Sequence, residues 1–454
     1  MANSSSKSIA VLGAGITGLT AAYRLSQRGH RVRLFEAAGQ VGGAIQTEHA
    51  EGWLSERGPN TVLTGEPALS ALIGELELSS ELVSANPDAR NRYIVRRGLA
   101  MAAPLSPPGF IRSPLFSVGA KLHLLSELLR RRRNRVADVS LEEFARGHFG
   151  QEIVDYAINP FVTGIYAGDP KKLSAQHAFP KLWRIEHEHG SLLRGQIALA
   201  KSRQGLPKPG IISFRRGLQV LPDAVARRLP PGTLYLRARI QALIPGSPWS
   251  VVWETDGQTH TERFDAVVAA LPAPALAQLR FGSLGERPLA SLDTIVHPPV
   301  TSLFLGYRRE QVAHPLDGFG MLIPEVEKRS ILGVLFSSTL FEGRAPKDHV
   351  ALTVLLGGTR QPELARLSPE EGVRTAEPDL QQLLGVRGSP VFQRHTFWPR
   401  AIPQYNLGYE QHLATMAAAE RAHAGFFMGG QARDGIALPA CIAAGERLAD
   451  RAAT

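Results

Sequence analysis

The fold is decided by one stretch near the start of the chain: Ile9-Ala10-Val11-Leu12-Gly13-Ala14-Gly15-Ile16-Thr17-Gly18, then Leu19 to Gly29, then Arg31-Val32-Arg33-Leu34-Phe35-Glu36. An apolar run of strand length meets a Gly-x-Gly-x-x-Gly turn, and a helical pattern begins at once. A second strand follows and ends in an acid. This order predicts a strand–helix–strand unit that binds a dinucleotide.

Each part of this stretch has a physical task in such a unit. Gly13 allows the tight turn, Gly15 lets the backbone approach a pyrophosphate, and Gly18 lets the helix lie close to the sheet. The helix N-terminus offers free N–H groups and the positive end of its dipole to phosphates. The acid can accept hydrogen bonds from ribose hydroxyls. The candidate cofactor contacts here are Gly13, Gly15, Ile16, Thr17, Gly18 and Glu36.

A second glycine pair, in Val41-Gly42-Gly43, follows Glu36 closely. It lets the backbone pass near the cofactor again, or it is an ordinary loop. In the large group of flavoproteins with two dinucleotide-binding motifs, the same order of triplet, acid and Gly-Gly marks FAD rather than NAD. That resemblance predicts FAD as the cofactor, with Gly42 and Gly43 among its contacts.

Length and composition favour a globular enzyme of two or three domains. The chain has 454 residues, of which 44% are hydrophobic and 20% charged. Cys441 is the only cysteine, so no disulfide can form within the chain and a reducing compartment fits. We expect no signal peptide, because residues 1–7 are polar. The longest uncharged stretch, Ala266 to Leu279, contains two prolines and is too short to span a bilayer.

The formal net charge of +10 favours anionic partners. Nucleic acid, anionic lipid and a ligand with carboxylates all remain open on charge alone. The run Arg130-Arg131-Arg132-Arg133, with Arg135, has no interleaved aromatic residues, and the sequence has no nucleic-acid fold signature. We therefore expect no nucleic-acid partner. The run is either a solvated helix end or, beside a leucine-rich helix face, a contact for lipid headgroups.

The middle of the chain predicts inserted helices. Pro104 to Pro114 is rich in proline and serine and predicts irregular structure. The predicted helical blocks are Leu122 to Leu129, Leu141 to Ile158 and Ala178 to Ser202. Asn159 to Asp169, between two of these blocks, is broken by glycines and is too apolar for a solvated loop. We expect this segment to line a site.

The second half of the chain is dominated by strand patterns. Two strands flank Asp256-Gly257 as in a hairpin, and Asp265 to Pro272 is a continuous apolar run typical of a buried parallel strand. The strands predicted for a second, mostly antiparallel sheet are Val300 to Tyr307, Gly320 to Ile323, Ile331 to Phe336 and Val350 to Leu356. Phe426 to Gly430 predicts one more buried strand, followed by the helix Leu438 to Ala453.

The predicted fold class is therefore α/β, with a Rossmann-like cofactor domain that is discontinuous in sequence. An α+β substrate domain and an α-helical domain are inserted into it. The predicted boundaries are 1–85, 210–278 and 405–454 for the cofactor domain, 86–97, 201–209 and 279–404 for the substrate domain, and 98–200 for the helical domain.

Several segments together resemble the oxygen-dependent, FAD-containing protoporphyrinogen oxidase family. Besides the glycine triplet, they are Gly164 to Asp169, Arg216 to Pro222, Gly318 to Pro324, Leu332 to Ser338, Phe341 to Pro346 and Trp398 to Tyr405. The resemblance implies that the helical domain associates with a membrane. It also implies that protoporphyrinogen IX loses six hydrogens to give protoporphyrin IX, while dioxygen takes the electrons through FAD and leaves as hydrogen peroxide. Coproporphyrinogen III is the alternative substrate in the wider family.

The same resemblance assigns substrate contacts residue by residue. Arg92 is similar to the arginine that pairs with a substrate propionate, and Gly164 to the glycine whose backbone lies against a pyrrole ring. Leu322, Leu335 and Leu355 match apolar side chains around the macrocycle. Without the resemblance, Arg92 reads as a surface arginine and the leucines as ordinary core residues.

Further cofactor contacts are carried over from the family. Ile240 matches a position whose backbone meets the adenine, and the C-terminal strand–helix junction matches the region at the pyrophosphate and isoalloxazine. The residues carried over are Ile240, Trp398, Gly430, Gly435, Ile436 and Ala437. Many relatives have Gly-Asn where this chain has Gly429-Gly430, so the junction departs from the family pattern.

No side chain is expected to be catalytic, because the flavin carries the chemistry. His187 and His189 lack further ligands at convincing spacing, so we expect no metal. Cys441 lies away from the position at which amine oxidases attach FAD covalently, so FAD should be non-covalent. We expect a cytoplasmic protein, peripheral on the inner face of the cytoplasmic membrane, and a homodimer is compatible with the resemblance. Another flavin-dependent amine oxidase or desaturase is the competing function.

Overall fold

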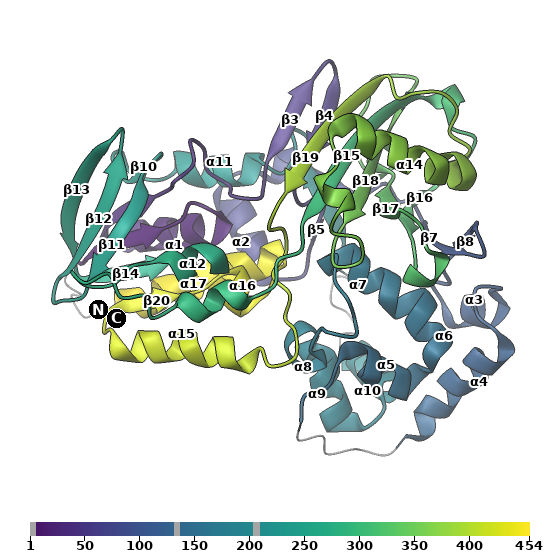
Figure 1. The fold of residues 1–454 in the computed structure, drawn as a ribbon, viewed down its shortest axis with the longest axis horizontal. Coiled ribbons are helices and arrows are strands. Elements are labelled where there is room, and N and C mark those ends of the chain that lie inside the picture. The colour runs from purple at the N-terminus through teal and green to yellow at the C-terminus, as the bar shows by residue number, and fades with distance from the viewer. Residues whose placement is uncertain (1–5, 131–136, 203–208) are drawn as a thin grey trace.

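The structure is a computed structural model that describes residues 6–130, 137–202 and 209–454. Its elements form three groups (Figure 1). A parallel sheet with its helices lies on the left of the view, a larger sheet lies at the upper right, and a cluster of helices lies below that larger sheet. The α/β fold with its two main sheets agrees with the predicted fold class. An inserted helical domain that associates with a membrane, and the domain boundaries drawn from the sequence, stay predictions.

The parallel sheet has five strands in the order β10-β2-β1-β14-β20. Its strands come from distant parts of the chain, so this sheet is discontinuous in sequence, as predicted. Every strand pairing in it is parallel. The strands are β1 (Ser8–Leu12), β2 (Arg31–Phe35), β10 (Leu234–Tyr235), β14 (Ala266–Ala269) and β20 (Phe426–Met428).

Helices α1 (Ile16–Gln27) and α17 (Leu438–Ala453) pack against this sheet and against each other. Their contact depends on a close approach of backbones. A Cβ added to Gly445 would lie 2.5 Å from the carbonyl oxygen of Thr17. Where α1 meets the end of β1, a Cβ added to Gly18 would lie 1.9 Å from the carbonyl oxygen of Gly13, so no side chain fits there.

Shorter elements surround the parallel sheet. A three-stranded meander carries the predicted hairpin, with Asp256 and Gly257 at φ values of 50° and 74°. The elements are β5 (Val62–Leu63), α2 (Pro67–Glu75), β6 (Leu82–Ser84), β9 (Ile211–Phe214), α11 (Val220–Arg227), β11 (Arg239–Ile244), β12 (Trp249–Thr255), β13 (Gln258–Phe264), α12 (Ala273–Gln278), α15 (Glu410–Ala422) and α16 (Gln431–Asp434). The hairpin of β3 (Thr47–Ala50) and β4 (Trp53–Glu56) lies beside the larger sheet instead, where Trp53 stacks on Phe392 (Figure 1).

The larger sheet has seven strands in the order β19-β15-β18-β17-β16-β7-β8. All neighbours are antiparallel except β16 and β7, so the prediction of a mostly antiparallel sheet is confirmed. The strands are β7 (Asn91–Arg96), β8 (Leu99–Ala102), β15 (Val300–Arg308), β16 (Gly318–Leu322), β17 (Ile331–Leu335), β18 (His349–Gly357) and β19 (Phe392–Trp398).

One face of the seven-stranded sheet is covered by α14 (Pro369–Leu384). The register aligns Met321, Val334 and Val354 across three neighbouring strands on this face. All three are buried, and they form one apolar core with Val373 and Leu380 of the helix. The alternate residues of the same strands therefore point to the opposite face.

The helical region differs from its prediction in three places. Pro104 to Pro114 contains the short helix α3, because Ser106 caps its N-terminus by accepting a hydrogen bond from the Gly109 N–H. Glycines at positive φ divide the two longer blocks, Gly150 at 82° and Gly190 at 72°. The helices are α3 (Pro107–Arg112), α4 (Val118–Ser126), α5 (Leu141–Phe149), α6 (Gln151–Ile153), α7 (Asn159–Tyr166), α8 (Ala175–Ala178), α9 (Pro180–His189) and α10 (Leu192–Ser202).

The third difference is that Asn159 to Asp169, expected from the sequence to separate two helical blocks, begins with helix α7. A π-helical turn at Val154–Ile158 leads directly into α7, whose first turn accommodates Pro160. The helix α4 ends at Ser126 and a 3₁₀ turn reaches Leu129, while Arg131 to Arg133 and Arg135 lie outside the described residues. Within the described ranges, no helix combines the length and apolar character that a membrane crossing requires.

Candidate functional site

The glycine triplet forms an open cradle between β1 and α1. Gly13 has φ 93° and donates its N–H to the carbonyl oxygen of Phe35 at 2.7 Å, which fixes the turn at the end of the strand. Gly15 is the N-cap of α1, and nothing lies within 4 Å of a Cβ built on it. The first turn of α1, which starts at Ile16 and Thr17, contains no acidic residue. The cradle therefore presents the positive end of the helix to open space.

The second glycine pair lies directly beside this triplet. The N–H of Gly42 donates to the carbonyl oxygen of Ala14 at 2.8 Å, and Gly15 and Gly42 form a parallel bridge. A Cβ on Gly43 would lie 3.5 Å from the Cα of Gly15. Gly42 has φ 105°, and a Cβ there would meet a carbonyl oxygen at 2.6 Å. The two glycine runs thus make one surface without side chains, as backbone contact with a pyrophosphate requires.

Glu36 lies against this surface at the end of β2. Its Oε2 accepts a hydrogen bond from the N–H of Ala14 at 2.7 Å, and its Oε1 accepts one from the N–H of Ala38 at 2.8 Å. Each carboxylate oxygen has a further lone pair for a ligand hydroxyl. The carbonyl oxygen of Glu36 also accepts from the N–H of Ala238, two residues before Ile240 in β11. Glu36 and Ile240 therefore belong to the same end of the cradle.

The C-terminal junction closes the other end. Gly430 has φ 111°, and a Cβ on it would lie 3.6 Å from Thr17 Oγ1 in α1. Gly435 has φ 118°, and Ile436 and Ala437 follow it up to the start of α17. Cys441 is buried one turn into this helix, and burial raises the pKa of its thiol to about 11. A thiol in that state is not a nucleophile at neutral pH.

Two tyrosines hold the short helix α16 beside Gly430. The Tyr409 hydroxyl donates to the carbonyl oxygen of Ala432 at 2.7 Å, and the Tyr405 hydroxyl donates to the carbonyl oxygen of Gln431. Both rings are buried, with their centroids 4.7 Å apart. The Trp398–Tyr405 segment thus reaches the cofactor junction through its last residue.

Trp398 itself lies at the end of β19, in the seven-stranded sheet. Its indole Nε1 donates to the carbonyl oxygen of Arg57 at 2.7 Å, in the segment after β4. The structure therefore places Trp398 between the large sheet and the cofactor region rather than in the glycine cradle. Its assignment as a cofactor contact stays a prediction.

The strand register brings the predicted substrate residues onto one face of the seven-stranded sheet. Arg92 and Leu335 both pair with Gly320, from the two sides of β16. On the neighbouring strand β17, Gly333 pairs with Leu322 of β16 on one side and with Leu355 of β18 on the other. These positions alternate with the residues that pack on α14, so all four side chains leave the sheet on its opposite face.

Helix α7 lies over this face. A Cβ on Gly164 would lie 2.8 Å from Leu322 Cδ2, so the absence of a side chain lets the helix approach the sheet. Leu322, Leu335 and Leu355 therefore share one sheet face with Arg92, and Gly164 of α7 lies against Leu322 on that face. The three leucines are half-buried, which distinguishes them from the fully buried residues on the α14 side.

Arg92 is exposed, and its charge is available to a ligand. Its guanidinium lies over the ring of Phe319, with 5.4 Å between Cζ and the ring centroid, and Nη1 donates to the carbonyl oxygen of Arg90 at 3.4 Å. Among residues 6–130, 137–202 and 209–454, no carboxylate forms an ion pair with Arg92. A carboxylate ligand at this edge of the sheet could take that place.

The structure adds Arg360, which the sequence analysis missed. Its guanidinium donates to the carbonyl oxygen of Ile323 at 3.1 Å and to Asn159 Oδ1 and Thr163 Oγ1 at 3.3 and 3.2 Å. Burial lowers the pKa of this group, and nearby Glu325 opposes that shift. Arg360 thus fixes α7 to the sheet, and no motif in the sequence marks it for that role.

Comparison with known proteins gives the family. The model of the family "Flavin containing amine oxidoreductase" matches residues 16–453. Protoporphyrinogen oxidase 2 of Arabidopsis thaliana is 36% identical, with 98% of this chain and 94% of that protein covered. Coproporphyrinogen III oxidase of Bacillus subtilis is 28% identical, with 99% and 98% covered. A crystal structure from Exiguobacterium sp. 255-15 has a TM-score of 0.83 at 24% identity, with 98% of each chain covered, and shares the fold.

Proposed function

The chain belongs to the flavin-containing amine oxidoreductases and is an FAD-dependent oxidoreductase, and from that premise we propose that it oxidises protoporphyrinogen IX to protoporphyrin IX. Six hydrogens leave the macrocycle. Three molecules of dioxygen accept them and become three molecules of hydrogen peroxide. The observation that carries the proposal is one sheet face that holds three half-buried leucines together with Arg92, which forms no ion pair with any carboxylate of the described residues.

The glycine cradle fits FAD. Two glycine runs side by side leave room for a pyrophosphate, the α1 N-terminus supplies N–H donors, and Glu36 supplies acceptors for ribose hydroxyls. FAD, when bound, accepts the hydride equivalents from the substrate. The attachment is non-covalent, because the thiol of Cys441 is buried and lies against the carbonyl oxygen of Gly435 at 3.5 Å. Acid precipitation should therefore release the flavin into the supernatant.

The protein's own residues hold and orient the macrocycle. Leu322, Leu335 and Leu355 give this sheet face an apolar surface of the kind that a flat ring system can contact, with the side chain of Leu322 lying over Gly333. Arg92 pairs with one propionate and so selects one rotation of a ring that could otherwise bind in several. Binding and orientation of this kind need no acid–base pair among the side chains.

Coproporphyrinogen III is the second candidate substrate, supported by the Bacillus relative that covers nearly the whole chain. Coproporphyrinogen III carries four carboxylates and protoporphyrinogen IX carries two. A comparison of the two substrates therefore tests the carboxylate preference of this site. We expect protoporphyrinogen IX to reduce the bound flavin faster under anaerobic conditions, measured as loss of flavin absorbance. Faster reduction by coproporphyrinogen III would select the alternative. Reduction by neither would point to another flavin-dependent oxidase.

The helical region supports a further proposal, peripheral attachment to an anionic membrane. Six large apolar residues of the α3–α4 segment are between 55% and 82% exposed. We name them the α3–α4 apolar face: Leu105, Ile111, Val118, Leu122, Leu125 and Leu129. Arg112 ends α3, and Arg130 opens the arginine run. An apolar face flanked by basic residues is typical of helices that lie in a lipid interface.

A buried polar network anchors this face to the rest of the helical region. Glu127 follows α4 and is fully buried, and His148 Nδ1 lies 2.9 Å from its Oε1. Ser191 Oγ and the N–H of Leu192 both donate to the same carboxylate, at 2.7 Å each. Burial alone would raise the pKa of Glu127, but these hydrogen bonds bring it below its usual value. The apolar face is thus presented on a fixed helix.

A further inference from the structure

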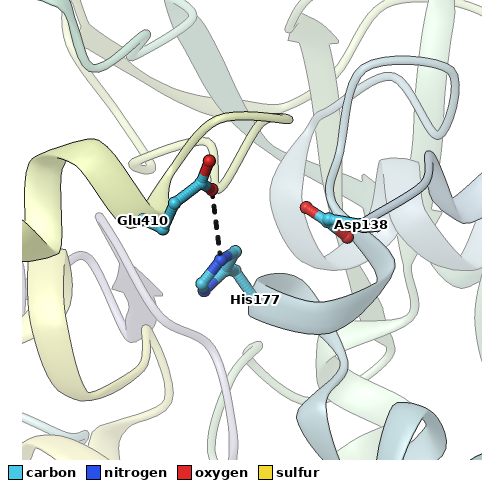
Figure 2. A group of neighbouring side chains, drawn as sticks. All are labelled: Asp138, His177 and Glu410. Carbon is cyan, nitrogen blue, oxygen red and sulfur yellow. Dashed lines mark ion pairs between the residues drawn. The ribbon is translucent and has the colours of Figure 1, made fainter. Parts of the chain in front are cut away.

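Asp138, His177 and Glu410 converge at one point although they are far apart in the sequence (Figure 2). Asp138 precedes α5, His177 lies in α8, and Glu410 is the first residue of α15. One ligand atom from each residue lies within 4.8 Å of the other two, and His177 Nε2 is 3.6 Å from Glu410 Oε2. In Figure 2 both carboxylates flank the imidazole ring.

The backbone around this cluster is fixed by three chain segments that run side by side. The N–H of Ala175 donates to the carbonyl oxygen of Val139 at 2.9 Å, and the N–H of Ser174 donates to the carbonyl oxygen of Tyr405 at 2.8 Å. The N–H of His177 donates to Ser174 Oγ, also at 2.8 Å. The backbone next to Asp138 and around His177 is therefore held by main-chain and serine hydrogen bonds, and the Tyr405 contact ties it to the segment that leads into α15.

The carboxylate of Asp138 is only partly satisfied by hydrogen bonds. Its Oδ1 accepts one hydrogen bond, from the N–H of Gln176 at 3.3 Å. Its Oδ2 is buried and accepts no hydrogen bond from residues 6–130, 137–202 or 209–454. A buried carboxylate oxygen without a donor or cation loses its hydration with no compensation. The side chain of Glu410 is 60% exposed, so the same point is open to solvent from one side.

We propose that Asp138, His177 Nε2 and Glu410 bind a divalent first-row transition cation such as Zn²⁺ or Mn²⁺. One imidazole nitrogen and two carboxylates form a donor set that these ions accept. Metal–ligand distances of about 2.0–2.2 Å require the ligand atoms to draw closer together, and the exposed Glu410 side chain can turn to do so. Water takes the remaining coordination positions on the solvent side.

This site has a structural role. It ties the helical region, through Asp138 and α8, to α15, which packs against β20 of the parallel sheet. None of the three residues belongs to the glycine cradle or to the sheet face under α7. The bound ion therefore stabilises the arrangement of these two parts without contacting flavin or substrate.

The test uses the full-length, FAD-loaded protein after dialysis against EDTA. Calorimetric titration with ZnCl₂, and separately with MnCl₂, should give one ion per chain. His177→Ala and Asp138→Asn should each lower the affinity by about tenfold or more. The matched control is His189→Ala, because His189 Nε2 lies 3.9 Å from a carboxylate of Glu188 but in no three-ligand cluster of the described chain. Its affinity should equal that of the wild type.

Thermal denaturation gives a second readout that does not depend on activity. Saturating Zn²⁺ should raise the Tm of the wild type and of His189→Ala by a few degrees and leave that of His177→Ala unchanged. Flavin absorbance should be the same with and without the ion. Less than stoichiometric binding by the wild type, or undiminished binding by both His177→Ala and Asp138→Asn, overturns the proposal. If His177→Ala does not fold, the ion affinities of Asp138→Asn and Glu410→Gln decide whether the cluster binds the ion.

Discussion

Gln404 donates a hydrogen bond from its Nε2 to the carbonyl oxygen of Tyr166, 2.8 Å away, and both residues are buried. Gln404 belongs to the Trp398–Tyr405 segment, and Tyr166 belongs to the Gly164–Asp169 segment. These two segments carry much of the family resemblance, and the structure shows that they meet in space. The contact needs Gly168, because a Cβ at that position would lie 2.3 Å from Gln404 Oε1.

The first prediction is that Gly168→Ala destabilises the protein. Gln404 is held by its hydrogen bonds and cannot move aside freely, so the added methyl group should cost about 1–3 kcal/mol. The control is Gly74→Ala, at an exposed helical position where a Cβ meets nothing within 4 Å. That change should leave the protein as stable as before or slightly more stable. The Tm of both variants, measured with FAD in excess, checks this, and equal Tm values would contradict it.

The second prediction concerns Glu36 and FAD. Glu36→Ala removes the acceptor for the ribose hydroxyls and for the N–H of Ala14, so the Kd for FAD should rise about ten- to hundredfold. Fluorescence titration of the apoprotein with FAD measures it. Glu254→Ala, which removes an exposed carboxylate on β12, is the control and should bind FAD normally. Normal binding by Glu36→Ala would show that the acid only shapes the turn.

The third prediction is that Arg92 anchors the substrate. Arg92→Ala should lower kcat/KM by roughly ten- to several-hundredfold, the effect of losing one charged hydrogen bond of about 1.5–3 kcal/mol. Arg92→Lys should lower it less, because lysine keeps the charge and loses only the planar fork. Flavin content and Tm should stay near wild type, since Arg92 is exposed and lies outside the glycine cradle. Steady-state porphyrin fluorescence gives the rates.

Arg421→Ala, at an exposed position on α15, is the control for this series. Its efficiency should match the wild type. An Arg92→Ala variant of unchanged efficiency would remove Arg92 from the site. A loss of efficiency that follows a loss of FAD would assign Arg92 a structural role instead.

The fourth prediction concerns the α3–α4 apolar face. The double variant Leu122→Glu with Leu125→Glu should lose sedimentation with anionic vesicles, because it places two acids against an acidic surface. Wild-type binding should weaken as salt rises. Leu284→Glu is the control, since Leu284 is 90% exposed but lies on a loop after α12. Equal wild-type binding to neutral and anionic vesicles would exclude the electrostatic contribution.

The fifth prediction is a pH dependence of stability that arises from Glu56. Burial raises the pKa of this carboxyl to about 7, against hydrogen bonds from Thr47 and Leu218 that lower it. Below about pH 4.5 the folded and unfolded states both hold the proton, and above that pH only the folded state does. Stability therefore falls as pH rises towards 7, by up to about 3 kcal/mol, and changes no further above it.

Glu56→Gln isolates this effect, because glutamine resembles the protonated acid and does not titrate. The Tm of the wild type relative to Glu56→Gln should fall between pH 5 and pH 8, measured in buffers of constant ionic strength. A difference in Tm that stays constant over this range would show that Glu56 is ionised throughout.

The sequence predicted the structure best where a single hydrophobic periodicity, that of a strand or of a helix, dominates a segment. The order of apolar run, glycine turn and helical pattern correctly predicted β1, α1 and β2, and Asp256-Gly257 correctly predicted its hairpin. By contrast, β19 was missed because Gln393, Arg394 and His395 interrupt its apolar residues. Its strand pairs with β15, so tertiary contact rather than local pattern decides its conformation.

Site geometry was the part that the sequence could not supply. Arg92 and Leu335 flank Gly320 because of the register of the three strands β7, β16 and β17. No local sequence pattern determines that register. Asn159 to Asp169 reads in the sequence as a glycine-broken segment between helical blocks, so α7 was not predicted. The structure shows that Gly164 is where the helix approaches Leu322 and that Pro160 lies in its first turn.

The pairing of β1 with both β2 and β14, and of β14 with β20, has a consequence for the order of assembly during synthesis. The seven-stranded sheet is complete once residue 398 has left the ribosome, whereas α1 finds its helix partner only when Gly445 can reach Thr17. Until residues 426–430 are made, the edge of β14 is unpaired and the junction at Gly430 does not exist. The complete cofactor site can therefore form only after every strand of the seven-stranded sheet has been synthesised, and a chain that stalls in between exposes a strand edge open to aggregation.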